Sequence, residues 1–170
     1  MFARHFIDSL DFAHNGRELR GLVPLAEMPR LQDILAIPEG EISYFVRGLP
    51  EKDGKPMLEV TVEGLCQLRC QRCLNGFAYP VKLVSHLLLT QAAELDEFSV
   101  DESNDVDSIA ADKHLDVLNM IEDEILLSLP FAPKHPLGEC QPVVEKFNPS
   151  EKHPFAVLEG LKNLAGLKKT

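Results

Sequence analysis

Alternating apolar and polar positions predict four strands along the chain. The pattern covers residues 18–23, 41–49, 57–70 and 79–89, where apolar side chains alternate with polar ones or form a short apolar run. Residues 50–55 contain the Asp-Gly pair that is typical of a hairpin turn. Gly64 falls between two halves of the third strand, and we expect a bulge there.

The strongest helical pattern runs from about Val117 to Leu129. Asp116 precedes it as an N-cap, and Pro130 ends it. Its apolar residues share one stripe at helical spacing. These residues are Val117, Leu118, Ile121, Ile125 and Leu129.

Two weaker helical patterns accompany it. A short one surrounds Met28, Leu31 and Leu35, after the first strand. The other begins near Pro154, at a residue type that is favoured in the first turn of a helix, and Gly166 can close it. We expect this last helix to cover the domain's own core.

These elements predict a single α+β domain over residues 1–170. We expect a curved antiparallel β-sheet, partly barrel-like, with the 117–129 helix packed on it and a C-terminal helical tail at about 153–170. The segment 94–107 holds seven acidic residues and no lysine or arginine. Such a segment buries too little apolar area to offset its ordering entropy, so we expect a mobile acidic loop.

The charge of the chain is unevenly distributed. Seventeen basic against 27 acidic residues give a net charge of -10, which argues against general nucleic-acid binding. The stretch 64–90 nevertheless contains no acid. It carries the basic and aromatic residues that we predict as an RNA or partner contact. They are Arg69, Arg72, Lys82 and Tyr79.

The four cysteines suggest a zinc site. Cys70 and Cys73 form a Cys-x-x-Cys turn, which suits half of a tetrahedral site. Cys140 is the expected third ligand, and the fourth is either His135 or Cys66. We expect the neighbouring arginines to lower the thiol pKa values. A degenerate remnant of such a site is the alternative, because Cys140 has no cysteine partner three residues away.

The sequence also indicates the cellular compartment and the state of the cysteines. The N-terminus does not have the pattern of a signal peptide, and no apolar run is long enough for a membrane span. We therefore expect a cytoplasmic protein with metal-bound or free thiols. The consecutive acids Glu122, Asp123 and Glu124 point in different directions from a helix, and we expect them on a solvated surface. We find no active site, and we expect neither an enzyme nor a small-molecule substrate.

Three sequence blocks resemble the YceD family, the large ribosomal RNA subunit accumulation proteins. The first block is residues 70–74, the second is 121–130 with the residues on to Cys140, and the third is 154–158 with 161–162. The resemblance implies a bacterial cytoplasmic protein that acts in synthesis, processing or stability of the large-subunit ribosomal RNA. Some relatives carry a second Cys-x-x-Cys where this chain has only Cys140, which implies an ancestral four-cysteine zinc site.

The function expected from all of this is a non-enzymatic accessory factor for 23S ribosomal RNA. Its partners would be ribosomal RNA or a ribosomal protein of the large subunit, and the acidic loop would mimic or repel phosphate or hold a basic ribosomal protein. One alternative is a small zinc- or thiol-dependent enzyme that uses the Cys-x-x-Cys turn. Another is a protein-binding adaptor whose C-terminal helix docks into a partner's groove.

Overall fold

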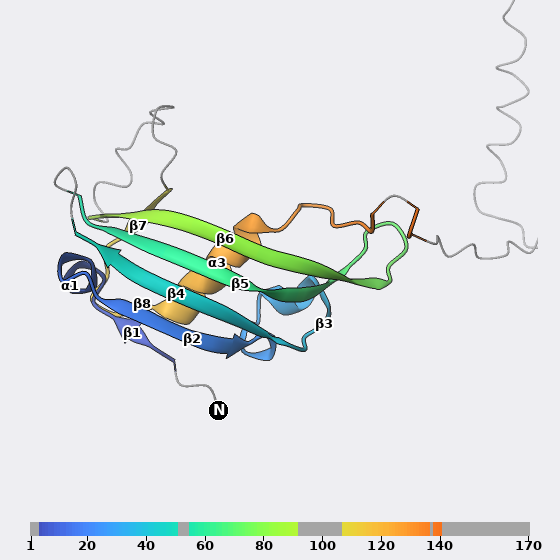
Figure 1. Cartoon of the computed structure of the whole chain (residues 1–170), viewed down its shortest axis with the longest axis horizontal. Coiled ribbons are helices and arrows are strands. Elements are labelled where there is room, and N and C mark those ends of the chain that lie inside the picture. Colours follow the sequence, from blue (N-terminus) through green and yellow to red (C-terminus); the bar gives the residue numbers. More distant parts are fainter. Residues whose placement is uncertain (1–3, 51–54, 92–106, 137, 141–170) are drawn as a thin grey trace, which may run out of the picture.

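A curved six-stranded sheet carries the fold (Figure 1). The computed structural model describes residues 4–50, 55–91, 107–136 and 138–140. The strands of this sheet are β2 (Glu18–Pro24), β3 (Leu35–Ile37), β4 (Glu41–Leu49), β5 (Met57–Arg69), β6 (Gly76–Thr90) and β7 (Asp107–Ala110). Five of them lie in the order β2-β4-β5-β6-β7, and β3 pairs with β5. The four predicted strands are thus confirmed as β2, β4, β5 and β6.

The hairpin of β5 and β6 is the longest element of the sheet. Its antiparallel register runs without interruption from Met57↔Leu88 to Arg69↔Gly76. The expected bulge at Gly64 is wrong, because Gly64 keeps the register with both neighbouring strands. A Cβ at this position would lie 2.4 Å from Cδ1 of Ile42, so the glycine leaves room for that side chain.

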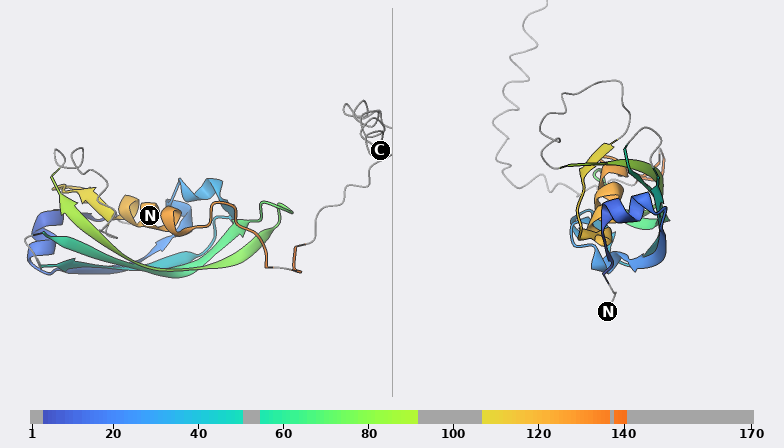
Figure 2. Two further views of the ribbon diagram at one scale, coloured as in Figure 1. Left: turned by 90° about the horizontal axis from the view of Figure 1, so that it is seen from above. Right: turned by 90° about the vertical axis from the view of Figure 1, so that its left-hand side faces the viewer.

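The main helix, α3 (Val117–Ser128), packs against the sheet and agrees with the prediction to one residue. The Asp116 carboxylate accepts hydrogen bonds from the N–H groups of Leu118 and Asn119, as a helix N-cap does. Figure 2 shows α3 on the concave side of the sheet, where its apolar face meets the inner residues of β4, β5 and β6. This contact forms the hydrophobic core.

Short elements at the N-terminus close one end of the sheet. The helix α1 (Ser9–His14) packs against β4, and β1 (Phe6–Ile7) pairs with β8 (Leu115–Asp116) just before α3. None of the three was predicted. A helix of six residues shows too little periodicity for a sequence pattern to reveal it.

The structure corrects three expectations about the architecture. Two 3-10 helices, η1 (Leu25–Glu27) and η2 (Leu31–Asp33), followed by β3, replace the short helix expected around Met28. The strand β7 is parallel to β6, so the sheet is not wholly antiparallel. The sheet is also open rather than closed into a barrel, since the described residues of β2 and β7 lie at opposite edges.

Several expected features lie outside the described residues. They are the acidic loop apart from Asp107, which begins β7, and the C-terminal helical tail. In the described part of the chain, no helix is long and apolar enough to cross a membrane.

Candidate metal centre

The turn between β5 and β6 places two cysteines on one side of the hairpin end. The N–H of Cys70 donates to the carbonyl oxygen of Asn75 at 2.9 Å, and the N–H of Leu74 donates to the carbonyl oxygen of Cys70 at 2.9 Å. Leu74 has a φ of 63°, a left-handed conformation that few residues other than glycine adopt. This tight turn holds the side chains of Cys70 and Cys73 together.

The segment after α3 returns to this turn, as the orange trace in Figure 1 shows. At the C-cap of α3, Leu129 has an extended backbone, and Pro130 follows it. The carbonyl oxygen of Pro133 then accepts the N–H of Gln71 at 2.9 Å. This hydrogen bond fixes the segment against the hairpin end and brings His135 and Cys140 to the two cysteines.

Four potential ligand atoms gather at this point. The side chains of Cys70, Cys73, His135 and Cys140 place these atoms within 4.8 Å of one another. Sγ of Cys70 lies 3.8 Å from Sγ of Cys140, and Sγ of Cys73 lies 3.5 Å from Nδ1 of His135. The four residues could therefore hold a metal ion.

These two distances match the edges of a zinc tetrahedron. Zinc–sulfur bonds of about 2.3 Å and zinc–nitrogen bonds of about 2.0 Å imply sulfur–sulfur edges of about 3.8 Å and sulfur–nitrogen edges of about 3.5 Å. All four cysteines of the chain are free. The Cys70–Cys140 sulfur separation of 3.8 Å is far longer than the disulfide bond length of about 2 Å. The arrangement is that of a metal site rather than of a disulfide.

A phenylalanine lies beside the histidine of the cluster. The rings of Phe77 and His135 have centroids 4.9 Å apart, at an interplanar angle of 39°. Phe77 also meets Tyr79 edge to face, with centroids 6.4 Å apart. Because Phe77 comes from β6, the sheet itself places an aromatic ring beside the imidazole.

The protein environment lowers the pKa of one thiol of the cluster and raises that of another. Burial opposes ionisation of Cys70, yet hydrogen bonds from the backbone N–H groups of Cys73, His135 and Arg72 lower the pKa of Cys70 to about 5. Burial raises the pKa of Cys73, as do the neighbouring thiols. The expected lowering thus holds for Cys70 but not for Cys73, and hydrogen bonds from backbone amides are its main cause.

Arg72 contributes a positive charge beside the cluster. Its hydrogen bond with the side chain of Cys140 raises the pKa of the guanidinium. Its backbone N–H lies 3.4 Å from Sγ of Cys70. One residue therefore contacts two of the four potential ligands, and it favours their anionic forms.

Cys66, the other predicted candidate for the fourth ligand, lies apart from the cluster. It is completely buried on the inner face of β5, within the hydrophobic core. Burial raises the pKa of its thiol to about 11, which disfavours the thiolate that a metal requires. Of the two alternatives, the structure places only His135 with the other three residues.

The predicted RNA-contact residues do not share one surface. Arg69 ends β5 and Arg72 follows in the turn, and both are exposed. Lys82 lies further along β6, where it pairs with Glu63 across a distance of 3.0 Å. Tyr79 is an odd number of positions from Lys82 on the same strand, so its ring faces the opposite side of the sheet and packs against the core. Only the two arginines lie at the hairpin end.

The acidic residues of α3 differ from the solvated surface that we expected. Glu122 is only 1% exposed, and its carboxylate accepts the N–H groups of Arg30 and Leu31 at 2.7 and 3.1 Å. Glu124 is also buried, whereas Asp123 is exposed. Glu122 lies four positions after Leu118 and three before Ile125 in the apolar stripe, a spacing that could have revealed its burial.

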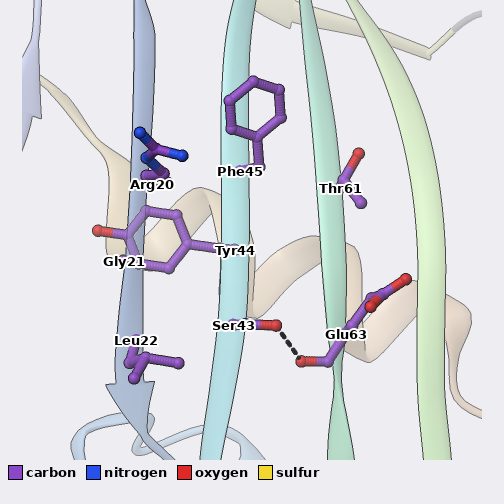
Figure 3. Close-up of a pocket in the computed structure, with 8 residues that line it drawn as sticks. All are labelled: Arg20, Gly21, Leu22, Ser43, Tyr44, Phe45, Thr61 and Glu63. Atoms are coloured by element: carbon purple, nitrogen blue, oxygen red, sulfur yellow. Dashed lines mark hydrogen bonds between the residues drawn. The ribbon is translucent and has the colours of Figure 1, made fainter.

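The outer face of the sheet carries a separate hollow of 490 Å³. Figure 3 shows Arg20, Phe45 and Thr61 in a row across β2, β4 and β5, with α3 behind the strands. Two rows further along the sheet, Oγ of Ser43 donates a hydrogen bond to the backbone carbonyl of Glu63 at 2.9 Å. The hollow shares no lining residue with the cysteine cluster.

Comparison with known proteins adds a family match. The family model described as large ribosomal RNA subunit accumulation protein YceD matches residues 58–162, more than half of the chain. The matched region contains all four residues of the cluster, together with β6, α3 and all of β5 except Met57. No curated protein and no solved structure matches the chain.

Proposed function

The chain belongs to the YceD family of large ribosomal RNA subunit accumulation proteins, and from this membership we propose that it is a non-enzymatic accessory factor for 23S ribosomal RNA. It would act in synthesis, processing or stability of that RNA, in the cytoplasm where ribosomes are made. The observation that carries the proposal is the match over residues 58–162, which spans the cluster and both elements that support it.

We further propose that Cys70, Cys73, His135 and Cys140 bind zinc. The donor set of three sulfurs and one nitrogen, and the two short separations between donor atoms, support this metal. Zinc there would cross-link the hairpin end to the segment after α3. Four protein ligands leave no coordination position for a substrate, so the donor set supports a structural role.

The hairpin end is the proposed contact surface for ribosomal RNA or a large-subunit protein. Arg69 and Arg72 are exposed on either side of Cys70. A zinc-closed turn would hold these cations in a fixed place, which lowers the entropic cost of binding. Lys82 and Tyr79 are less suited to the same contact, because one is paired with Glu63 and the other packs against the core.

A thiol-dependent enzyme is the rival proposal. The low pKa of Cys70 favours it, since a thiolate is the reactive form of cysteine. The complete burial of Cys70 weighs against it, as does the position of the Cys-x-x-Cys turn between two strands rather than before a helix. The adaptor hypothesis rests on the helix that the sequence predicts at the C-terminus, and these residues lie outside the described part of the chain.

The proposal is tested by measuring ribosomal RNA in cells that lack the protein. We expect the amount of large-subunit RNA to fall relative to small-subunit RNA, and the wild-type gene to restore it. Arg69→Glu should restore it poorly, whereas Arg20→Glu, an equal charge change at an exposed residue of β2, should restore it fully. An unchanged RNA ratio in cells without the protein would contradict the proposed function.

A further inference from the structure

A second cavity lies beside α3, away from the cysteine cluster. Its volume is 420 Å³, within the range of about 300–1,000 Å³ that is usual for ligand pockets. The walls come from α3, from β6 and β7, and from the loop that leads to β8. Leu87, Ile109 and Met120 give the pocket apolar walls.

The remaining lining is strongly acidic, but most of its carboxylates already have partners. Asp116 forms an ion pair with Arg4 at 3.0 Å and also caps α3. Asp123 forms an ion pair with Arg30. Asp112 accepts the backbone N–H of the residue two positions further on at 2.9 Å. These three carboxylates are therefore largely committed to the fold.

Glu124 is the exception among the acidic lining residues. It is 7% exposed, and within the described chain no hydrogen bond or ion pair engages its carboxylate. Among described side chains, only Nε of Arg47 is both sealed from solvent and without a partner, so the Glu124 oxygens are not sealed from solvent. A carboxylate on a residue that is 7% exposed is only partly hydrated, and without a partner this is costly; Glu124 also lines a cavity that can admit a partner.

We propose that this pocket binds the cationic side chain, arginine or lysine, of a basic polypeptide segment. The apolar walls would contact the aliphatic stem of that side chain, and Glu124 would meet its charged end. A metal ion fits less well. Among the described residues, the cysteine cluster is the only group with three or more potential ligand atoms close together.

The chemistry of the pocket also indicates which class of partner would suit the proposed function. A basic segment of a large-subunit protein would present such a side chain, and this biological interpretation rests on the proposed role in ribosomal RNA accumulation. The binding chemistry itself rests only on the pocket. The cavity and the cysteine cluster at the hairpin end share no residue, so they are separate candidate sites.

The test uses the full-length protein and a blocked pentapeptide with one arginine between glycines. We expect binding by calorimetry, and weak or no binding of the same peptide with the uncharged analogue citrulline. Glu124→Gln keeps the side-chain size and removes the charge, and it should weaken the binding by about tenfold or more. Glu27→Gln, the same change at an exposed residue of η1, should leave it unaltered.

Thermal unfolding without peptide provides a second readout. Removing an unpartnered buried charge should raise the Tm of Glu124→Gln, which also shows that the variant folds. A lower Tm would mean that the carboxylate already has a partner, and would overturn the proposal. Equal binding of the arginine and citrulline peptides would overturn it too, as would absence of binding to both arginine and lysine peptides at millimolar concentration.

These results are separable from the ribosomal RNA measurement. Failure of peptide binding would leave the expected loss of large-subunit RNA intact. A normal RNA ratio in cells without the protein would contradict the cellular function and leave the peptide result as it stands.

Discussion

Two adjacent carboxylates of α3 meet the same guanidinium in different surroundings. Nε of Arg30 lies 3.0 Å from the carboxylate of Glu122, whose side chain is 1% exposed. Another nitrogen of Arg30 pairs with Asp123, whose side chain is 53% exposed. Both carboxylates raise the pKa of Arg30, that of Asp123 most. Their contributions to stability should nevertheless differ, because water replaces the partner of an exposed group but not that of a buried one.

We predict that Glu122→Gln destabilises the protein by about 1–3 kcal/mol, through loss of charge-assisted hydrogen bonds in a buried place. Asp123→Asn is the matched control on the same guanidinium, and it should cost less than about 1 kcal/mol. Urea unfolding of both variants measures the difference. Equal losses of unfolding free energy in the two variants would show that the exposure of the carboxylate does not determine its contribution.

At the scale of residues, the sequence was most informative where spacing constrains geometry. Cys70 and Cys73 could be paired from their separation alone. The choice between His135 and Cys66 required the three-dimensional path of the segment after α3, which a hydrogen bond from Gln71 to Pro133 determines. The spacing of Glu122 in the apolar stripe could indicate its burial, but not its partner Arg30, which lies 92 residues away.

The helix α1 lies very close to the backbone of β4. A Cβ at Gly48 of β4 would lie 2.2 Å from the carbonyl oxygen of Phe12 and 2.7 Å from Cα of Ala13. Both atoms belong to the backbone and cannot rotate away. At Gly21 of β2, by contrast, a Cβ would meet the tip of the Tyr44 side chain at 2.7 Å. An added methyl group would therefore meet fixed backbone atoms at Gly48 and a movable side chain at Gly21.

Gly48→Ala should therefore destabilise the protein by about 1–3 kcal/mol, because it forces α1 away from β4. Gly21→Ala should cost less, since the tyrosine ring can shift. Denaturant unfolding compares the two variants, and amide exchange in α1 locates the damage. If Gly21→Ala were as harmful as Gly48→Ala, the contact between helix and strand backbone would not be the cause.

The elements that sequence predicted are those with long, regular patterns. The 13 residues of β5 and the 12 of α3 repeat their apolar positions often enough to be recognised. The four residues of β7 form a strand because they pair in parallel with the edge of β6. Sixteen residues separate the two strands in the sequence, so no local pattern links them. The two 3-10 helices lie on either side of Pro29, which interrupts the helical pattern, and the N–H groups of Arg30 and Leu31 bind the carboxylate of Glu122 in α3.

In the described part of the molecule, the hydrophobic core and the cysteine cluster lie in separate places. The hydrophobic core lies between α3 and the sheet and includes Cys66, but neither Cys70 nor Cys73. The cysteine cluster lies at the end of the β5–β6 hairpin, where the segment after α3 meets the turn. A change at one of these places should therefore leave much of the other intact.

Protein purified without added metal or a histidine tag should contain about one zinc per chain, and a Cys70→Ser/Cys73→Ser variant should contain none. Cys66→Ala is the control that should keep the metal. We expect zinc removal to speed amide exchange at Gln71 and in residues 130–136, while α3 and the inner residues of β4 exchange as before. Faster exchange throughout the core would contradict the separation of the core from the cluster.

The distance in sequence between Cys70 and Cys140 has a consequence for how the chain is made. These residues are 70 positions apart, and a link between them would remove about 4 kcal/mol of chain entropy from the unfolded state. During synthesis, the first two sulfurs leave the ribosome well before β7, α3 and the remaining ligands. The cluster can close only when nearly all of the described chain has been translated, so zinc capture would mark the last stage of folding on a nascent chain.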